Sequence, residues 1–293
     1  MTTTLIDFKS ARDQFIEYLG SHRRARATIV AYGKDIEQLS TFLTNMGKKT
    51  VEDVSRDELD AFLKKLGSDN YTPKSISRKI NSIKTFFRFL KANGLVALDP
   101  AVEIEHPKYD VKPPRILTKL EYRALRDACR GDARTYAIVE LFLQTGIRIG
   151  ELAALTTQDV KENELHIAAQ EGHAARNVPL NKAAKEALTS YLKLRTPTAD
   201  GQSGNTALFV TKTGKGLLIR NIRTGIDRYF RIAGIDGAKV NDLRHTFIAH
   251  HLMAGTSIMT LSKLVGHKRL STTEKYLELV KDKQTENVKL EEL

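Results

Sequence analysis

The chain has 293 residues, enough for two domains with ordinary cores, and its 41% hydrophobic and 28% charged residues are typical of a globular protein. Its formal net charge of +12 makes a polyanion the first expected partner, although a merely soluble basic protein fits the charge equally well. Cys129 is the only cysteine, which excludes an internal disulfide and a thiolate zinc site; with no signal peptide and no apolar stretch of membrane-spanning length, we expect a cytoplasmic protein.

Helical periodicity dominates the first hundred residues. Apolar side chains recur at helical spacing over residues 8–19 and 27–46, and a glycine follows each run. A third, shorter helix is predicted between Ser55, which caps it, and Gly67, which closes it.

A fourth helix is predicted over residues 72–93, where a proline occupies the first helical position. This segment contains no Asp or Glu, so an apolar stripe runs beside an outer face that is wholly basic. Such a face can enter a major groove or lie on phosphates, whereas solvated faces usually mix both signs, and we therefore favour DNA binding. The candidate DNA-binding residues are Lys74, Arg78, Lys79, Lys84 and Arg88.

Four prolines cluster where the periodicity fails, between Gly94 and about Thr118. They predict an extended linker. The chain is accordingly divided into an N-terminal helical domain over 1–106, a linker over 107–117 and a C-terminal domain over 118–293.

The C-terminal domain mixes helices with a few short strands, so the predicted fold class is mostly α with a small antiparallel β-sheet. Two of the strands are separated by a short turn at 171–174 and predict a hairpin. The predicted strands cover 165–170, 175–180 and 207–211, and the predicted helices cover 119–130, 133–145, 148–156, 181–194, 218–233, 241–254, 257–265 and 271–287.

Three segments of the C-terminal domain contain candidate site residues. The sequence TGIRIGEL places Arg148 just past a glycine that separates two helices, where its guanidinium can offer two parallel hydrogen bonds to a phosphate. The second segment is LRHTF, with Arg244, and the third is VGH, with His267, followed nine residues later by Tyr276. Each of these residues alone is more often an ion pair, a cap or a packing residue than part of a site, so only the combination is specific.

In this order and spacing, the segments resemble the tyrosine recombinase (phage integrase) family. Its members have an Arg in T-G-x-R-x-x-E-L, an L-R-H-[ST]-F box, and L-G-H nine residues before a nucleophilic Tyr. The likeness covers nearly the whole chain and is nearest to the short Xer-type members. It implies a helical, SAM-like core-binding domain followed by a mixed α/β catalytic domain.

The resemblance also implies a metal-independent reaction that requires neither a cofactor nor ATP. Arg148 and Arg244 would clamp the non-bridging phosphate oxygens, His267 would donate a hydrogen bond, and Tyr276 would attack to form a 3′-phosphotyrosyl link. The implied partner is double-stranded DNA, bound by a tetramer that holds two sites. Whether a partner recombinase or an accessory protein takes part is left open, as is the choice among dimer resolution, cointegrate resolution and integration.

The chain departs from the family in the predicted hairpin, where a lysine is expected to protonate the departing 5′ oxygen. Aligning Arg176 and the VPL at 178–180 with the family pattern places Glu171 at the lysine position. No lysine occurs between Lys161 and Lys182, so a small shift of the alignment does not restore it. A carboxylate beside a scissile phosphate is unfavourable because like charges repel.

A second departure is Asn241, included among the candidate catalytic residues, which stands where the family most often has His. Asn can hydrogen-bond to a phosphate but cannot transfer a proton. Three explanations are open: a weak or inactive DNA-binding relative, a substitute acid such as His173, or a water molecule with Glu171 turned away. A relaxing type IB topoisomerase is a further alternative, which the Xer-like N-terminal half disfavours. We expect a slow but functional recombinase, because loss of general acid catalysis costs about 10² to 10⁴ in rate.

Overall fold

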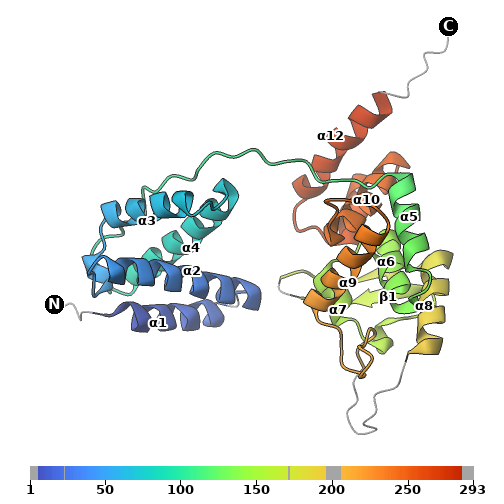
Figure 1. Ribbon diagram of the computed structural model, residues 1–293, viewed down its shortest axis with the longest axis horizontal. Helices are drawn as coiled ribbons and strands as arrows, with labels where there is room; N and C mark the ends of the chain where they lie inside the picture. Colours follow the sequence, from blue (N-terminus) through green and yellow to red (C-terminus); the bar gives the residue numbers. More distant parts are fainter. Residues whose placement is uncertain (1–5, 23, 171, 196–205, 286–293) are drawn as a thin grey trace. The chain divides into compact units, whose positions relative to one another are not determined.

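The computed structural model describes residues 6–22, 24–170, 172–195 and 206–285, and it confirms the predicted fold class, with many helices and one small antiparallel sheet (Figure 1). The chain divides into two compact units, Met1–Val111 and Lys112–Leu293. The predicted linker, residues 107–117, contains neither helix nor strand.

The described part of the N-terminal unit is built from α1 (Phe8–Ser21), α2 (Arg26–Asn45), α3 (Arg56–Ser68) and α4 (Pro73–Ala92), with a short 3-10 turn between α2 and α3. Side-chain caps fix where several of them begin: Asp7 caps α1, Ser55 caps α3 and Thr72 caps α4. The core is rich in aromatic side chains, and the fully buried ring of Phe15 packs edge-on against Phe86 at 5.3 Å between centroids.

A buried ion cluster joins α2 to α4 inside this unit. The Asp35 carboxylate, 3% exposed, accepts hydrogen bonds from Lys79 at 2.8 Å, from Arg78 at 2.5 and 2.8 Å, and from Ser82 at 3.0 Å. Burial alone would raise the pKa of Asp35, but the hydrogen bonds from Arg78 and Lys79 outweigh it and hold the pKa below its ordinary value.

This cluster corrects the expected basic face of α4. Lys79 does not lie on that face: it is buried and also donates to Gln38 at 2.6 Å. Arg78 is partly exposed although it is tied to Asp35, and Lys84 is half-buried and donates to the carbonyl of Val102 at 3.1 Å. Lys74 and Arg88, which are exposed, keep the expected placement.

The C-terminal unit has α6 and α10 near its centre, and side chains on nearly all sides of these two helices are buried. Helix α6 packs against α8, α5 and α10, while α10 packs against α11 and α12 (Figure 1). The helices described in this unit are α5 (Lys119–Cys129), α6 (Ala133–Thr145), α7 (Ile149–Ala154), α8 (Lys182–Leu194), α9 (Ile219–Ile232), α10 (Val240–Met253), α11 (Ile258–Val265) and α12 (Ser271–Thr285), with a 3-10 turn at Thr157–Asp159.

The sheet consists of β1 (Glu164–Ile167) and β2 (Arg176–Pro179), which pair antiparallel with Leu165 opposite Val178. Both strands are shorter than predicted, so the connection between them is longer than a tight turn and contains an isolated bridge between Gln170 and His173.

The predicted strand over 207–211 is wrong. Leu208 donates its backbone N–H to Leu155, whereas Thr211 bonds to Lys215 and Phe209 accepts from Leu217. The segment therefore forms only isolated bridges, because its hydrogen bonds are divided among separate neighbours instead of one continuous strand.

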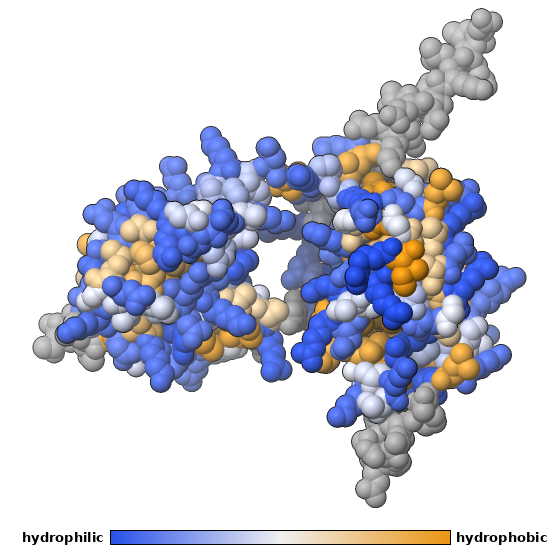
Figure 2. All heavy atoms as spheres, in the orientation of Figure 1, coloured by the Kyte–Doolittle hydropathy of each residue, from blue (hydrophilic) through white to orange (hydrophobic). Residues whose placement is uncertain are grey.

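Figure 2 shows hydrophilic residues over most of the visible face of each unit, with smaller apolar patches between them. None of the helices in the described ranges combines the length and the apolar character that crossing a membrane requires.

Candidate active site

The turn between α6 and α7 sets the direction of Arg148. Gly146 ends α6 in the left-handed conformation at φ 59°, and a Cβ on it would lie 2.3 Å from the ring of Phe247. Only glycine, which has no Cβ, fits this close to Phe247. The chain turns at Gly146, and Arg148 then becomes the N-cap of α7. The predicted break between two helices before Arg148 is confirmed.

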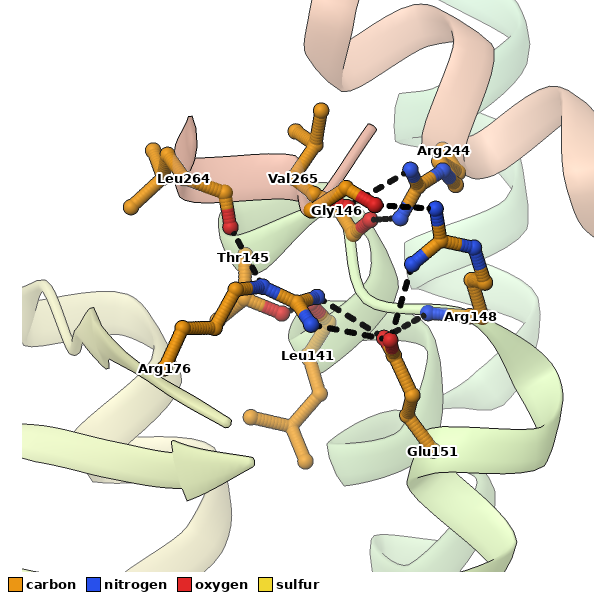
Figure 3. Close-up of polar contacts among 10 residues, drawn as sticks. Leu141, Thr145, Gly146, Arg148, Glu151, Arg176, Arg244, Leu264 and Val265 are labelled. Atoms are coloured by element: carbon orange, nitrogen blue, oxygen red, sulfur yellow. Dashed lines mark hydrogen bonds and ion pairs between the residues drawn. The ribbon is translucent and has the colours of Figure 1, made fainter. Parts of the chain in front are cut away.

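Glu151 connects two arginines from different elements (Figure 3). Glu151 is only 5% exposed. Its carboxylate accepts one hydrogen bond from the backbone N–H of Arg148 at 2.8 Å and another from the Arg148 guanidinium at 2.9 Å. Arg176 on β2 donates two further hydrogen bonds to it, at 2.9 and 2.8 Å. Burial alone would raise the pKa of Glu151, but the hydrogen bonds and charges of the two arginines lower it to about 2.

Arg244 lies beside Arg148 and is nearly fully buried, with 6% of the residue exposed. Its guanidinium donates to the carbonyl of Gly146 and, at 2.8 Å, to that of Val265, while Arg148 donates to the carbonyl of Gly266 at 2.5 Å (Figure 3). Burial, together with the positive charge of Arg148, lowers the pKa of Arg244 to about 9. Two guanidinium groups are thus held in place by carbonyl dipoles, and a bound anion would stabilise both.

Tyr276 projects from α12 into the same region and is 5% exposed. Its hydroxyl lies 2.6 Å from Nδ1 of His245, and its ring stacks on that of His267 with 6.4 Å between centroids. Burial raises the pKa of Tyr276, and the nearby charge of Arg244 opposes this shift.

His267 follows the left-handed Gly266 that ends α11. Its Nδ1 is hydrogen-bonded to the hydroxyl of Thr273 at 2.7 Å, which fixes the orientation of the ring. Burial, followed by the charges of Arg244 and Arg148, lowers the pKa of His267 to about 4, so the imidazole is neutral at pH 7.

The loop between β1 and β2 approaches these residues. Burial lowers the pKa of His173, and the charges of Arg148 and Lys268 lower it further. Lys268, from the segment after α11, also lies against this loop, because a Cβ on Gly172 would be 2.8 Å from its ammonium nitrogen. Glu171, the residue at the expected lysine position, lies outside the described residues.

The structure therefore brings Arg148, Arg244, His267 and Tyr276 together, whereas Asn241 is exposed at the start of α10. Among the residues described, no cluster of three or more His, Cys, Asp or Glu side chains could hold a metal ion.

Four residues of this region were missed as site residues: Glu151, Arg176, His245 and Lys268. Glu151 and His245 stand inside the two arginine motifs, and the spacing of three residues from Arg148 could have identified Glu151 as its partner. No local pattern predicts Lys268, because it reaches the hairpin loop from a segment almost a hundred residues further along the chain.

Residues 115–283 match the phage integrase family, and residues 13–94 match the N-terminal SAM-like domain of phage integrases. The chain is 34% identical over 277 residues to a tyrosine recombinase XerC from Roseiflexus castenholzii, an alignment that covers 91% of this chain and 88% of the relative. It is 30% identical over 285 residues to XerC from Neisseria meningitidis, covering 93% of this chain and 92% of the relative.

Solved structures give a consistent result. The crystal structure of XerA recombinase is 25% identical, with a TM-score of 0.53, and the match covers 97% of this chain and 100% of that one. A lambda integrase dimer bound to a COC′ core site has a TM-score of 0.77 at 18% identity, covering 99% of this chain and 81% of that one. The second likeness concerns the fold alone.

The buried carboxylate of Glu151 should contribute strongly to stability at neutral pH. Its folded pKa of about 2 lies below the ordinary 4.5, so its contribution is present above about pH 4.5 and is lost as the pH falls toward 2. We expect Glu151→Gln to lower the free energy of unfolding by about 3 kcal/mol at pH 7, and the deficit to narrow as the pH is lowered from 5 to 3.

Urea unfolding followed by circular dichroism measures both quantities. Glu186→Gln is the matched control: this carboxylate is exposed on α8, 3.9 Å from Lys182, and its loss should change stability by less than about 0.5 kcal/mol. Equal stability of the two variants at pH 7 would contradict the role given to Glu151.

Proposed function

Because this chain belongs to the phage integrase family and is a site-specific tyrosine recombinase, we propose that it cleaves and rejoins DNA through a 3′-phosphotyrosyl intermediate formed by Tyr276. The observation that carries this proposal is the position of the Tyr276 hydroxyl. It lies in one buried region with His267 and with Arg244, whose guanidinium is adjacent to that of Arg148.

The arginines supply the electrostatic part of catalysis. Phosphoryl transfer spreads negative charge over the non-bridging oxygens, and donors that are already oriented stabilise this charge without reorganisation. Arg244 has its pKa lowered to about 9 by burial and by Arg148, so a phosphate between the two side chains offsets their repulsion. His267, held by Thr273, donates a hydrogen bond to the same phosphate through its other ring nitrogen.

The covalent step conserves the energy of the broken bond. The Tyr276 oxygen forms a bond to phosphorus, and the bond from phosphorus to the 5′ oxygen breaks, which leaves a free 5′ hydroxyl after protonation. A 5′ hydroxyl from the partner strand then attacks the phosphotyrosine and releases the tyrosine, so rejoining requires no ATP.

We expect Tyr276→Phe to abolish covalent attachment while DNA binding is retained, because only the nucleophilic oxygen is removed. A nicked suicide substrate traps the adduct, which is measured as a DNA-linked band on a denaturing gel. Tyr229→Phe is the control, since its hydroxyl bonds to Asp132 and its loss should leave the band unchanged. Absence of a band with the unaltered protein would instead favour a non-catalytic DNA-binding relative, and relaxation of a plasmid without two-site resolution would favour a topoisomerase.

The N-terminal unit binds DNA through the exposed part of α4 in this proposal. Lys74 and Arg88 are exposed on α4 and lack the tie to Asp35 that holds Arg78, which supports their proposed contact with phosphates. Lys79 instead stabilises the helix pair from inside. The complex is proposed as a tetramer on two sites, and a solved lambda integrase structure is a tetramer bound to a Holliday junction.

Lys74→Gln should weaken DNA binding for all sequences and reduce the slope of log affinity against log salt by about one, because one phosphate contact is lost. Fluorescence anisotropy at several salt concentrations, in a Tyr276→Phe background, measures both effects. The control is Lys65→Gln on α3, whose ammonium pairs with Asp69. An unchanged slope for Lys74→Gln would remove this residue from the interface.

The leaving 5′ oxygen needs a proton, and Lys268 is proposed to supply it. Its ammonium lies against Gly172 in the loop where the family's lysine is expected, although it comes from the segment after α11. His173, the acid first considered, has its pKa lowered by burial and by the charges of Arg148 and Lys268, so it is largely neutral at pH 7.

Lys268→Ala should slow cleavage of an ordinary site by about 10² to 10⁴. Cleavage of a 5′-phosphorothiolate site should be nearly normal, because a thiolate leaves without protonation. Single-turnover rates on the two substrates make the comparison, with His173→Ala tested beside it and Lys263→Ala, an exposed α11 residue, as the control. Equal slowing on both substrates would show that Lys268 is not the acid, and rescue confined to His173→Ala would assign the role to His173.

A further inference from the structure

We propose that His245 accepts the proton of Tyr276 when the tyrosine attacks DNA. This inference rests on the proposed role of Tyr276 as the nucleophile. The observation that carries it is the hydrogen bond between Nδ1 of His245 and the Tyr276 hydroxyl, 2.6 Å long, in a partly buried contact between α10 and α12. The roles proposed above for the arginines, His267, Lys268 and Tyr276 leave this imidazole without a function.

The placement follows from the geometry of α10. His245 comes directly after Arg244, and successive residues on a helix point in different directions. Arg244 extends toward the carbonyls of Gly146 and Val265, while His245 points to α12 and meets the tyrosine there. One helical turn thus supplies both a guanidinium for the phosphate and an imidazole for the nucleophile.

Tyr276 needs an acceptor because its hydroxyl is buried. Burial raises its pKa above the ordinary value for tyrosine, so the phenol does not ionise by itself near pH 7. Other side chains are poorly suited to take the proton: Asn241 cannot accept one, and His267 has one ring nitrogen bonded to Thr273 and its pKa lowered to about 4.

In the proposed reaction, the proton moves from Tyr276 to His245 during attack and returns to the tyrosine during rejoining. In the resting state His245 carries hydrogen on Nε2, and its bare Nδ1 accepts the hydrogen bond from the phenol. As the bond from the Tyr276 oxygen to phosphorus forms, the proton passes to Nδ1 and the imidazole becomes an imidazolium. When the phosphotyrosine is attacked by a 5′ hydroxyl, the imidazolium returns this proton to the departing phenol oxygen.

The charged and titratable groups around His245 favour its neutral form before attack. Burial lowers its pKa, Asp242 on the same helix raises it, and Arg244 lowers it. Tyr276 faces it from α12, and His267 from the loop before α12 interacts with it electrostatically. His245 is therefore deprotonated at pH 7, and its ability to accept a proton is lost as the pH falls through its pKa, below 6.5.

Two substitutions separate proton acceptance from positioning. His245→Asn places an amide oxygen near the position of Nδ1 and keeps a hydrogen-bond acceptor for the tyrosine, but it cannot take a proton. His245→Ala removes both functions and opens space for free imidazole. His250→Asn is the matched control, because His250 is exposed on the same helix.

Single-turnover cleavage of a nicked suicide substrate is measured from pH 5 to 8, with DNA affinity measured separately. We expect both His245 variants to bind DNA normally and to cleave it about 10² to 10⁴ more slowly at pH 7. The cleavage rate of the unaltered protein should fall at acid pH as His245 becomes protonated, and the two variants should not show this fall. Added imidazole should restore the rate of His245→Ala, while His250→Asn should match the unaltered protein.

A rate for His245→Asn within about threefold of the unaltered protein would show that the imidazole only positions the tyrosine, and would overturn the proposal. Retention of the acid-side fall in rate, or failure of imidazole to rescue His245→Ala while its circular dichroism is normal, would also overturn it. If the unaltered protein forms no adduct, the proposed function itself fails. If the unaltered protein forms the adduct and the His245 variants cleave at the same rate, only the role of His245 is rejected.

Discussion

The active site depends on one buried carboxylate. Arg148 and Arg176 come from a helix start and a strand, and both bind Glu151, which has about 5% of its surface exposed and its pKa lowered to about 2. Without this anion, the guanidinium groups of the C-terminal unit would repel one another in a medium where water screens poorly. Glu151 thus allows positive charge to accumulate near Arg244 before any phosphate is bound.

Burial surrounds the positive charges of the site, and it also raises the pKa of Tyr276, the proposed nucleophile. The hydroxyl of Tyr276 is hydrogen-bonded to Nδ1 of His245 at 2.6 Å. In the proposed reaction, a DNA phosphate supplies negative charge that offsets the repulsion between the arginines, and its phosphorus is the electrophile. The proposed reaction requires pre-oriented dipoles and a proton acceptor, and α10 offers Arg244 and His245 for these roles.

In the N-terminal unit, the basic residues of α4 do not all lie on the solvent-facing surface that the sequence predicted. The basic residues of α4 were expected on one solvent-facing surface, yet Lys79 is buried against Asp35 from α2, and Arg78 shares that carboxylate. The sequence pattern of α4 correctly predicted its apolar stripe and the exposure of Lys74 and Arg88, because these positions follow from helical spacing alone. It could not identify Asp35 as a partner, since that contact spans more than forty residues.

The sequence by itself determined the fold class, most of the helices, the family, and the four residues Arg148, Arg244, His267 and Tyr276 as one candidate set. These follow from local periodicity, capping residues and motifs of fixed spacing, all of which short segments encode. Only the tertiary structure decided that Glu151 is shared with Arg176, that His245 holds the tyrosine hydroxyl, and that Lys268 approaches the loop from which a lysine is missing. The physical reason is that these contacts join segments far apart in the chain, so their existence depends on how α10, α12 and the hairpin pack.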